Sequence, residues 1–477
     1  MPKVPIIERR TKVVATIGPA SRETEMLAAM IRAGADVFRL NFSHGTAAEH
    51  TETIGRIREA SEETGKWVAI LGDLPGPKLR LDEVTDGIVR VHAGSELTLT
   101  IDECLGTAER LPLSFEGLTK AVEPGDPIFL ADGRIRLKAK HVGEREVLCE
   151  VETGGSVASH QGVNLPGAAA GMPSAGKADM EWVDFAVDHE IDLLAVSFVR
   201  TAQDLVPINE RIRSRGSDIP LIAKIEKPQA LEDTERIIDE AVSGIMVARG
   251  DLGIELPIEH VPPTQKRLIR LAGSRSKPVI TATQMLASMV HSDRPTRAEV
   301  TDVANAIYDS SDAVMLSEET AIGEYPLEAV QMMDRIAQQA ELDLPYEEWL
   351  RSRVHAAPGD VAAAVAESAV SATRRLGLKA IVVPTRSGRT ARLVSAYRPE
   401  VPIVAISPRK ETVRRLNLLF GVRCYLHHEW GDLNELLVES GAIAREVGVA
   451  SPGDLIVITA GLPEHELGTN VFEIHRV

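Results

Sequence analysis

Two charged residues, Lys224 and Glu226, stand two positions apart in the apolar, β-forming run 221–226. On a strand, residues i and i+2 point to the same face, so the ammonium and the carboxylate are expected side by side. Long charged side chains are rarely buried without a partner or a function. For the pair taken alone, a salt bridge at a strand end is the simpler explanation, so the interpretation depends on what the neighbouring strands carry.

Polar residues also follow most of the other apolar runs that have the composition of strands. They gather at residues 39–44, 73–80, 249–251, 281–284 and 317–320. In a parallel α/β barrel the active site lies at the carboxyl ends of the strands, where such residues would meet. Chance placement would seldom produce this convergence, which favours a functional site over isolated salt bridges.

The residue types at these ends suit a phosphate group and a divalent metal ion. Glu226 and Asp251 offer hard carboxylate oxygens of the kind that Mg2+ or Mn2+ prefers. Arg39, Arg80 and Lys224 supply the positive charge that a phosphoryl group needs.

Another group of residues suits a carboxylate. Gly250 lies between Arg249 and Asp251, where a glycine would let backbone N–H groups approach an anion closely. Thr283 adds a hydroxyl that we expect beside the same centre. The sequence contains neither a GxxxxGK[ST] segment nor a GxGxxG segment that opens a helix, so an ordinary P-loop or Rossmann site is not expected.

Short β-type runs, most of them followed by an amphipathic helical pattern, would position these residues. The runs cover residues 13–16, 37–40, 68–71, 193–197, 221–225, 245–248, 279–282 and 313–316, and helical patterns cover residues 23–33, 47–64, 179–189, 201–213, 297–306 and 327–340. Eight such runs predict a (β/α)8 TIM barrel. A doubly wound sheet is the structural alternative, although it seldom needs so many units.

Two segments differ in character from the barrel. Residues 80–167 are rich in Gly, Asp and short alternating runs, which predicts a small antiparallel β domain inserted in a barrel loop. After about residue 345, strands and helices alternate as in an open α/β domain. We therefore expect an α/β protein with its barrel over residues 1–73 and 168–345, a small β-barrel lid domain over 74–167 and an open α/β domain over 346–477.

The composition limits the partners and the compartment. The chain of 477 residues has a net charge of −17, which argues against general binding to nucleic acid or to a membrane surface. Cys104, Cys149 and Cys424 have no metal-type spacing, which predicts a reducing compartment without a disulfide framework. Because no apolar signal region and no apolar run of membrane length is present, we expect a cytoplasmic protein.

Several segments, taken in order, resemble the pyruvate kinase family. They are residues 11–21 (TKVVATIGPAS), 39–45 (RLNFSHG), 162–167 (GVNLPG), 246–253 (MVARGDLG), 280–286 (ITATQML), 295–300 (PTRAEV) and 315–321 (MLSEETA). The resemblance covers essentially the whole chain. It implies transfer of a phosphoryl group from phosphoenolpyruvate to ADP, which gives pyruvate and ATP, with Mg2+ or Mn2+ as cofactor and a homotetrameric assembly.

The resemblance also implies roles for the charged residues. Arg39 would hold the transferring phosphoryl group, and Lys224 would neutralise the charge on that group and on the enolate left behind. Glu226 and Asp251 would bind Mg2+. Such a division agrees with the physics of phosphoryl transfer, in which positioning and charge neutralisation dominate.

The remaining implied roles concern the substrate and the nucleotide. The amides of Gly250 and Asp251 would bind the substrate carboxylate, and Thr283 would lie near the methylene carbon that must be protonated, with water as the carrier of the proton. Asn41 and Arg80 would face the nucleotide, and Asp132 is where the family's lid approaches it.

Residues 73–80 depart from the family pattern. Many pyruvate kinases have DTKGPEIR where this chain has DLPGPKLR, so Lys78 replaces a glutamate that accompanies a requirement for K+. The K+ ligands that the resemblance implies are Asn41, Ser43, Asp73 and the carbonyl of Leu74. An ammonium near the same carboxylate could supply the charge that K+ brings, which predicts activity without K+. The alternative is a solvated Lys78 beside an unchanged K+ site.

Other departures are smaller. Gln161 replaces a lid lysine that contacts nucleotide phosphate in the family, which would weaken nucleotide binding unless a neighbour such as His160 compensates. Glu318 stands where glycine is usual, and nothing in the sequence explains it.

A loop in the C-terminal region has the composition of an anion site. It consists of Thr385, Arg386, Ser387, Gly388, Arg389 and Thr390, at the expected start of a helix. In the family the matching loop binds a phosphorylated sugar or nucleotide effector. The alternative is a capped helix start with solvated arginines.

Two rival functions belong to other classes. A metal-dependent aldolase of phosphoenolpyruvate or pyruvate chemistry would explain Glu226 and Asp251, but not the lid or the Arg39 motif. A catalytically silent regulatory relative is disfavoured because Lys224, Glu226, Asp251 and Thr283 are all present.

Overall fold

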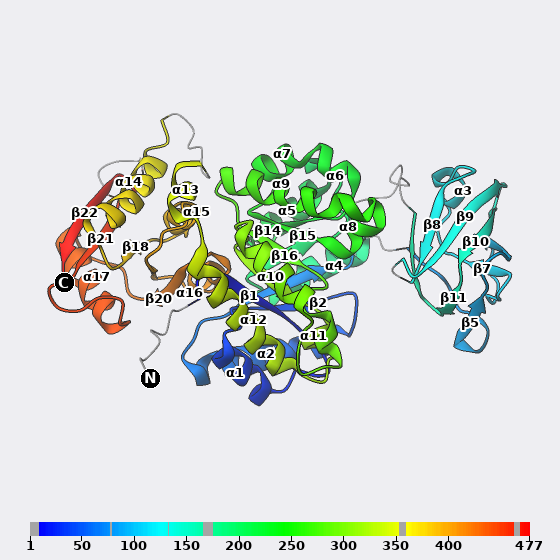
Figure 1. Cartoon of the computed structure of the whole chain (residues 1–477), viewed down its shortest axis with the longest axis horizontal. Coiled ribbons are helices and arrows are strands. Elements are labelled where there is room, and N and C mark those ends of the chain that lie inside the picture. The colour runs from blue at the N-terminus through cyan, green and yellow to red at the C-terminus, as the bar shows by residue number, and fades with distance from the viewer. Residues whose placement is uncertain (1–8, 77–78, 132, 166–174, 353–358, 462–467) are drawn as a thin grey trace.

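The computed structural model describes residues 9–76, 79–131, 133–165, 175–352, 359–461 and 468–477. Three bodies lie along one line in Figure 1. The barrel is in the centre, the inserted β domain lies at the right and the C-terminal α/β domain at the left. Lys78, predicted to replace K+, and Asp132, assigned to the nucleotide site, lie outside the described residues.

Eight parallel strands close into a barrel in the order β1-β17-β16-β15-β14-β13-β3-β2. They are β1 (Lys12–Ile17), β2 (Val37–Asn41), β3 (Ala69–Leu74), β13 (Leu193–Val196), β14 (Leu221–Ile225), β15 (Gly244–Ala248), β16 (Val279–Ala282) and β17 (Ala313–Leu316). The closing pair is β1 with β17, and β3 pairs with β13 across the insertion. The predicted (β/α)8 barrel is therefore confirmed.

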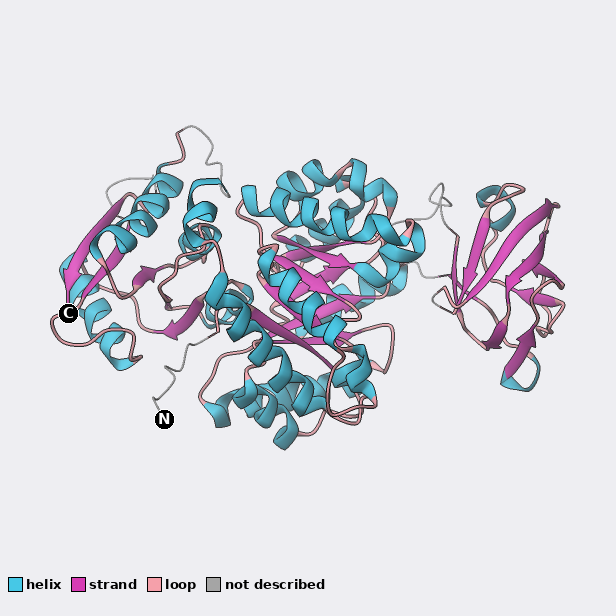
Figure 2. Cartoon of the chain, in the orientation of Figure 1, coloured by secondary structure: helices cyan, strands magenta, loops and turns pink. Residues whose placement is uncertain are grey.

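Helices surround the barrel and cover the outer faces of its strands, as Figure 2 shows. They are α1 (Thr24–Ala33), α2 (Ala47–Thr64), α4 (Lys177–Asp188), α5 (Val206–Ser214), α6 (Pro228–Glu232), α7 (Thr234–Arg236), α8 (Arg249–Glu255), α9 (Val261–Ser274), α10 (Arg297–Tyr308), α11 (Glu318–Ala321) and α12 (Pro326–Ala340). Local signals set their ends: Thr46 and Glu49 form a capping box at the start of α2, and Gly34 ends α1 with φ of 114°.

The inserted domain is built from two sheets around a core of its own. Its elements are β4 (Leu79–Arg80), β5 (Ile88–Val91), β6 (Glu96–Thr100), β7 (Arg110–Pro112), α3 (Leu118–Ala121), β8 (Pro127–Leu130), β9 (Ile135–Val142), β10 (Glu146–Thr153), β11 (Gly155–Ala158) and β12 (Gly162–Asn164). One sheet has the order β4-β12-β8-β9-β10-β6-β7, and β11 pairs with β5 in the other. Leu97, Leu137 and Val147 lie fully buried in the core.

The C-terminal domain is an open sheet between helices, in the order β20-β19-β18-β21-β22. Its strands are β18 (Ile381–Pro384), β19 (Ile403–Ser407), β20 (Val422–Leu426), β21 (Leu455–Ala460) and β22 (Val471–Arg476), and only the β21–β22 pair is antiparallel among them. Its helices are α13 (Tyr346–Ser352), α14 (Val361–Leu376), α15 (Arg389–Ala396), α16 (Lys410–Arg415) and α17 (Leu433–Glu446).

A buried arginine joins the C-terminal domain to the barrel. Arg398 is 1% exposed and donates from Nη1 to Oδ1 of Asp312, just before β17, at 2.8 Å. Its Nη2 donates to the carbonyl of Ser310 at 3.0 Å, and its guanidinium lies 4.5 Å from the centre of the Phe420 ring. Because a buried charge is costly without partners, this cluster depends on both domains being in place.

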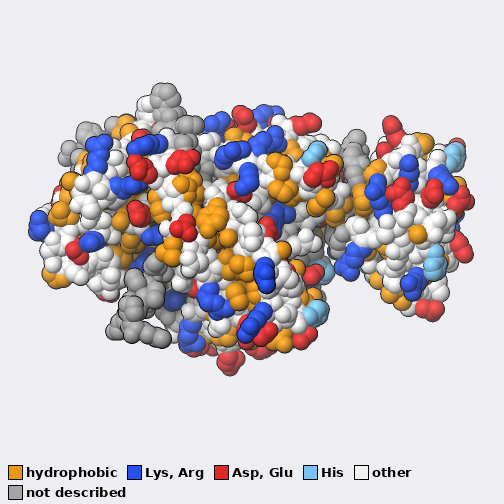
Figure 3. Space-filling view, in the orientation of Figure 1, with side chains coloured by type: hydrophobic (Ala, Val, Ile, Leu, Met, Phe, Trp, Pro, Cys, Tyr) orange, Lys and Arg blue, Asp and Glu red, His pale blue; other side chains and the backbone are white. Residues whose placement is uncertain are grey.

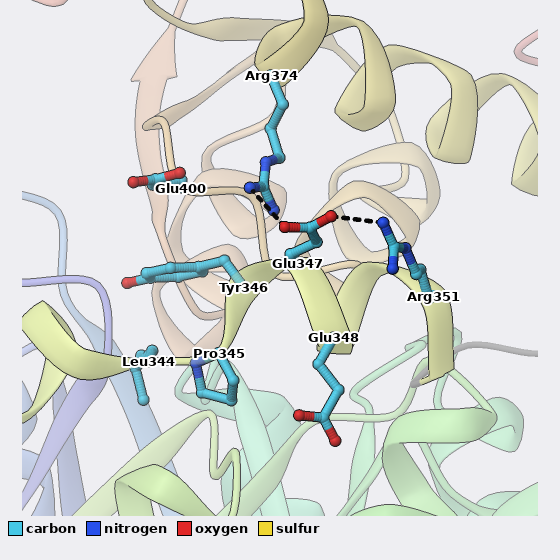
Figure 4. A pocket seen from close by; sticks show the side chains of 8 residues that line it. All are labelled: Leu344, Pro345, Tyr346, Glu347, Glu348, Arg351, Arg374 and Glu400. Atoms are coloured by element: carbon cyan, nitrogen blue, oxygen red, sulfur yellow. Dashed lines mark hydrogen bonds and ion pairs between the residues drawn. The ribbon is translucent and has the colours of Figure 1, made fainter.

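A pocket of about 570 Å3 opens at the start of α13 (Figure 4). Two arginines line it, Arg351 and Arg374, and both are bonded to the carboxylate of Glu347. Glu348 and Glu400 also line the pocket, so its three carboxylates outnumber its two arginines, which makes it a poor phosphate site.

The surface carries charges of both signs. On the face in Figure 3, basic and acidic side chains are interspersed over all three bodies. Every helix in the described part of the chain is too short or too polar to cross a bilayer.

The three cysteines are free and differ in environment. Burial raises the pKa of Cys149 and of Cys424 to about 12 each, whereas Cys104 is exposed. At pH 8 the fraction of each buried thiol that is ionised is about 10⁻⁴, and thiolate is the reactive species.

We expect a disulfide reagent to modify one thiol of the folded chain rapidly and all three after denaturation, and Cys104→Ser to abolish the rapid phase. Rapid modification of more than one thiol in the folded protein would contradict this assignment.

Candidate active site

The carboxyl ends of the barrel strands bring together the charged residues that the sequence singled out. In the parallel register of β2 and β3, Asn41 lies opposite Asp73, and Arg39 stands two residues earlier on β2. Lys224 is the penultimate residue of β14, and Glu226 follows the end of that strand. Because all eight strands are parallel, these ends lie on one rim of the barrel.

Asp73 is the centre of this cluster, and its side chain is only 2% exposed. Its Oδ2 accepts a hydrogen bond from Arg39 Nε at 2.7 Å, and its Oδ1 lies 3.4 Å from Lys224 Nζ. Burial alone would raise the pKa of Asp73, but Lys224 and Arg39 outweigh burial and hold the pKa below its usual range. The carboxylate therefore stays ionised and fixes the positions of both cations.

Lys224 lies between two carboxylates. Its Nζ is 2.9 Å from Glu226 Oε1 and donates to Ser197 Oγ at 2.7 Å. Burial would lower the pKa of Lys224, but Asp73 and Glu226 outweigh it and raise the pKa above its usual range. The salt bridge that the sequence favoured for the isolated pair is present, yet it belongs to a larger cluster in which Lys224 is a permanent positive charge.

Glu226 and Asp251 have the environment that a divalent cation would satisfy. Glu226 is fully buried, and its Oε2 accepts a hydrogen bond from the amide of Phe198 at 2.7 Å. Its Oε1 faces the Lys224 ammonium but accepts no well-aligned hydrogen bond from the described residues. Burial raises the pKa of Glu226, Lys224 opposes that rise, and the nearby Asp251 adds to it. Two carboxylates that repel each other, beside a single ammonium group, fit an oxygen-liganded ion such as Mg2+.

The turn after β15 meets the end of β16. The amide of Gly250, in the first turn of α8, donates to Thr283 Oγ1 at 2.7 Å. The Thr283 hydroxyl donates to the carbonyl of Ala282 at 2.6 Å, and its backbone has φ of 69°. The resemblance implies that the Gly250 amide binds the substrate carboxylate. In this structure the amide donates to the Thr283 hydroxyl instead, which places the two residues side by side.

Arg249 connects three elements near the Gly250–Thr283 pair. It donates to the carbonyls of Ala282 and Thr283 at 3.2 and 2.7 Å and to Asp302 Oδ1 at 2.7 Å. These bonds tie the start of α8 to the end of β16 and to α10. Arg249 therefore holds the Gly250–Thr283 pair in place.

Two residues of the cluster were not singled out from the sequence. Ser197 joins Lys224 to the carbonyl of Leu74, to which it donates at 2.7 Å. Thr16 accepts from Arg39 Nη1 at 3.1 Å. Both stand at the carboxyl end of a barrel strand, and a search for hydroxyls at those positions would have found them.

Two of the residues assigned to the nucleotide, Asn41 and Arg80, lie in different domains. Asn41 is on the barrel rim, where its Oδ1 accepts from the amide of Ser43 at 3.2 Å. Arg80 is on β4 of the inserted domain and donates to the carbonyl of His160 at 3.1 Å. Asp132 lies outside the described residues.

The expected K+ ligands lie close together in the fold, but two of them are engaged by other groups. Both carboxylate oxygens of Asp73 face cations, and the carbonyl of Leu74 accepts the hydrogen bond from Ser197. Lys78 lies outside the described residues.

Residues 385–388 form a tight turn before α15, and Arg389 and Thr390 are the first residues of that helix. The hydroxyl of Thr385 accepts from the amide of Gly388, whose φ is 80°. Arg386 pairs with Glu429 at 2.9 Å, and Arg389 pairs with Asp360 at 2.9 Å. An anion would have to compete with these carboxylates for the two arginines.

Clustered cations beside two carboxylates, at the carboxyl ends of a closed (β/α)8 barrel, define a phosphotransferase of the barrel type. The family model described as "Pyruvate kinase, barrel domain" matches residues 8–330, and "Pyruvate kinase, alpha/beta domain" matches residues 363–475. The chain belongs to the pyruvate kinase family.

Individual relatives agree along the whole chain. A pyruvate kinase of Staphylococcus saprophyticus is 43% identical over 473 residues, which are 98% of this chain and 80% of that protein. One from Staphylococcus aureus strain MRSA252 is 42% identical over 472 residues, again 98% of this chain and 80% of the relative. The crystal structure of a pyruvate kinase from Cryptosporidium parvum superposes with a TM-score of 0.92 at 36% identity and covers 98% of this chain and 96% of its own.

Proposed function

We propose that this chain transfers the phosphoryl group of phosphoenolpyruvate to ADP, with Mg2+ bound by Glu226 and Asp251. The observation that carries the proposal is Lys224, a permanent cation 2.9 Å from Glu226 and 3.4 Å from Asp73 at the rim of the barrel. When bound, Mg2+ supplies charge neutralisation and orientation for substrate oxygens.

Each cation has a distinct task in this reaction. Arg39, held by Asp73 and Thr16, binds the transferring phosphoryl group. Lys224 neutralises charge on that group and on the enolate that remains when the phosphorus–oxygen bond breaks. Because its pKa is raised, Lys224 keeps its proton and is not the acid that converts the enolate to pyruvate.

The carboxylate and methylene ends of the substrate belong to the other side of the site. The amides of Gly250 and Asp251 bind the substrate carboxylate, which then replaces the Thr283 hydroxyl as partner of the Gly250 amide. The released hydroxyl lies beside the methylene carbon and orients the water that protonates it.

The nucleotide binds between the barrel rim and the inserted domain. Asn41 on the rim and Arg80 on β4 face it, together with Asp132. Approach of the inserted domain excludes water, which favours ADP over hydrolysis.

A coupled assay tests the reaction. Pyruvate release is measured with phosphoenolpyruvate and Mg2+, with and without ADP. We expect release only with ADP, and a loss of release when Mg2+ is chelated. Release without ADP would indicate a phosphatase, and cleavage of a carbon–carbon bond would indicate the aldolase alternative.

We further propose that the reaction does not require K+. The two oxygens of Asp73 already face Arg39 and Lys224, and Lys78 adds one positive charge to the segment that would otherwise bring a glutamate. Turnover is expected to change by less than about twofold when K+ replaces tetramethylammonium at constant ionic strength.

Lys78→Glu should create a requirement for K+. The new carboxylate removes the ammonium and adds negative charge, so we expect K+ to raise turnover of this variant by about tenfold or more. Lys120→Glu, at an exposed position of the same domain, makes the same charge change and should stay insensitive to K+. Strong stimulation of the unmodified protein by K+ would refute the proposal.

We propose that residues 385–390 bind a phosphorylated sugar or nucleotide effector in a homotetramer. Binding would exchange the Arg386–Glu429 and Arg389–Asp360 pairs for bonds to phosphate. Arg386→Gln is expected to abolish activation by such effectors without changing turnover in their absence.

A further inference from the structure

A group of metal-ligating side chains lies in the C-terminal domain, far from the barrel rim. His427 and His428 follow the end of β20, and Glu439 projects from α17. Glu439 Oε2 is 3.8 Å from His427 Nδ1 and 3.8 Å from His428 Nε2. The three ligand atoms all lie within 4.8 Å of one another.

A second observation concerns the hydrogen bonding of Glu439 Oε2. Glu439 Oε2 is buried, yet it accepts no hydrogen bond from the part of the chain that the structure describes. A buried polar atom without a partner is costly. The adjacent Glu435 adds an oxygen 3.9 Å from His428 Nε2, so the negative charge around the imidazoles exceeds that of one carboxylate.

The two imidazole–carboxylate distances would need only a small contraction around an ion. Zinc–nitrogen and zinc–oxygen bonds of about 2.0–2.2 Å place tetrahedral ligand atoms about 3.3–3.5 Å apart. The imidazole–carboxylate separations here, at 3.8 Å, are only slightly longer. His427 Nδ1 also lies 3.2 Å from the carbonyl of His428, and metal binding would replace that contact.

The donor set selects the kind of metal. Two imidazoles with one carboxylate suit Zn2+ and similar transition metals, whereas Mg2+ prefers oxygen ligands alone. The side chain of His428 is 62% exposed, that of Glu439 31% and that of His427 only 19%, so an ion can enter on the His428 side. We propose that His427, His428 and Glu439 form a binding site for a divalent transition-metal ion of the Zn2+ class.

Titration of the full chain with Zn2+ tests the site. Calorimetry in excess Mg2+, which occupies the oxygen ligands of the barrel, is expected to show one Zn2+ per chain. His427→Ala and Glu439→Gln should each weaken this binding by about tenfold or more. His291→Ala is the matched control, because His291 is exposed and paired with a glutamate, Glu324, outside the site. Unchanged stoichiometry and affinity in both site variants would overturn the proposal.

Trp430 provides a second readout that does not depend on activity. Its ring is stacked 5.6 Å from the His427 ring, so bound Co2+ should quench its fluorescence. Co2+ should also give the visible absorption of a tetrahedral complex. Both signals are expected to vanish in Glu439→Gln and to persist in His291→Ala. Octahedral Co2+ absorption without quenching would place the ion elsewhere and contradict the site.

A different feature, the attachment of the inserted domain, carries a second inference. Asp179, in the first turn of α4, is 3% exposed and accepts two backbone hydrogen bonds. The amide of Gly76, on the outgoing connection, donates to Oδ1 at 2.9 Å, and the amide of Gly176, on the returning connection, donates to Oδ2 at 2.8 Å. One carboxylate thus holds both connections of the domain on the barrel.

We infer that Asp179 is a positioning residue that sets where the inserted domain lies relative to the barrel rim. The position of Gly76 is also restricted. Its φ is 65°, and a Cβ at this residue would come within 2.8 Å of the Phe198 ring. This inference rests on the proposed function. It predicts that a change at Asp179 weakens the binding of ADP, which lies between the two domains, and leaves the binding of phosphoenolpyruvate unchanged.

Asp179→Asn is the informative variant, because it keeps one acceptor oxygen and the size of the side chain. We expect KM for ADP to rise about fivefold, the effect of one lost hydrogen bond, with KM for phosphoenolpyruvate within about twofold. Asp184→Asn is the control, because Asp184 lies on the same helix but is paired with Arg211 and not with either connection. Equal KM values for ADP in Asp179→Asn and the unmodified protein, in an active preparation, would refute the inference but leave the proposed function intact.

Discussion

Lys224→Met is expected to lower turnover by about 10²–10³ while the barrel stays folded. The ammonium lies against the carboxylates of Asp73 and Glu226, and in the proposed reaction it neutralises the negative charge that develops on the substrate. Methionine has a similar length and fills the same space without the charge. The loss should therefore appear mainly in turnover, measured by pyruvate release at saturating substrates.

The control for this prediction is Lys12→Met at the opposite end of the barrel. Lys12 is also nearly buried, it lies 3.6 Å from Asp36, and it donates to the carbonyl of Val422 at 2.8 Å. Both variants remove a buried lysine from a carboxylate and should lose similar stability. Only Lys224→Met should lose turnover, and near-normal turnover in that variant would refute the role assigned to Lys224.

Arg398→Ala is expected to cost about 3–5 kcal/mol of unfolding free energy, because it breaks the buried ion pair between Arg398 and Asp312. The native guanidinium is 1% exposed, lies 2.8 Å from Asp312 and contacts the Phe420 ring. The measurement is urea unfolding followed by circular dichroism, with Arg398→Lys as an intermediate case. Because several domains unfold, the midpoint of the affected transition is compared rather than one global value.

A second ion pair between the C-terminal domain and the barrel provides the control for Arg398→Ala. Arg415 of the C-terminal domain lies 2.8 Å from Asp218 of the barrel, where the Asp218 side chain is 82% exposed. Arg415→Ala should cost less than about 1 kcal/mol, because water replaces most of an exposed interaction. Equal losses for Arg398→Ala and Arg415→Ala would contradict the importance of burial at this junction.

The barrel could be predicted because its strands are buried on both faces and therefore appear as short apolar runs. For the same reason Lys224 and Glu226 stood out, since any charge in such a run is conspicuous. Residues without charge at equivalent positions gave no comparable signal. Ser197, which bonds to Lys224, was included in a predicted strand without a role.

Helices were harder to predict where prolines and glycines stand near their starts. The helical pattern over residues 201–213 is interrupted in the structure: a 3-10 turn over Ala202–Leu205 precedes α5, which begins at Val206 beside Pro207. Proline fits the first turn of a helix but not its interior. The sequence also did not predict α9, which begins with Val261 and two prolines.

Contacts between distant segments could not be read from the chain. The bond from the Gly250 amide to Thr283 and the bonds of Asp179 to Gly76 and Gly176 join residues on different elements. Their geometry depends on how strands and helices pack, which no local pattern specifies. The Lys78 hypothesis depends on such geometry too, and the test with K+ addresses it directly.

The pairing of β3 with β13 and of β1 with β17 constrains how the protein is made. A ribosome releases the first three barrel strands well before β13, and the strand made first finds its closing partner only when β17 emerges. Meanwhile the inserted domain has its own core and can fold as a unit, which brings the two ends of the inserted segment close together. We therefore expect the insertion to shorten the effective loop between β3 and β13, and the closure of the barrel by its last strand to be the slow step of folding.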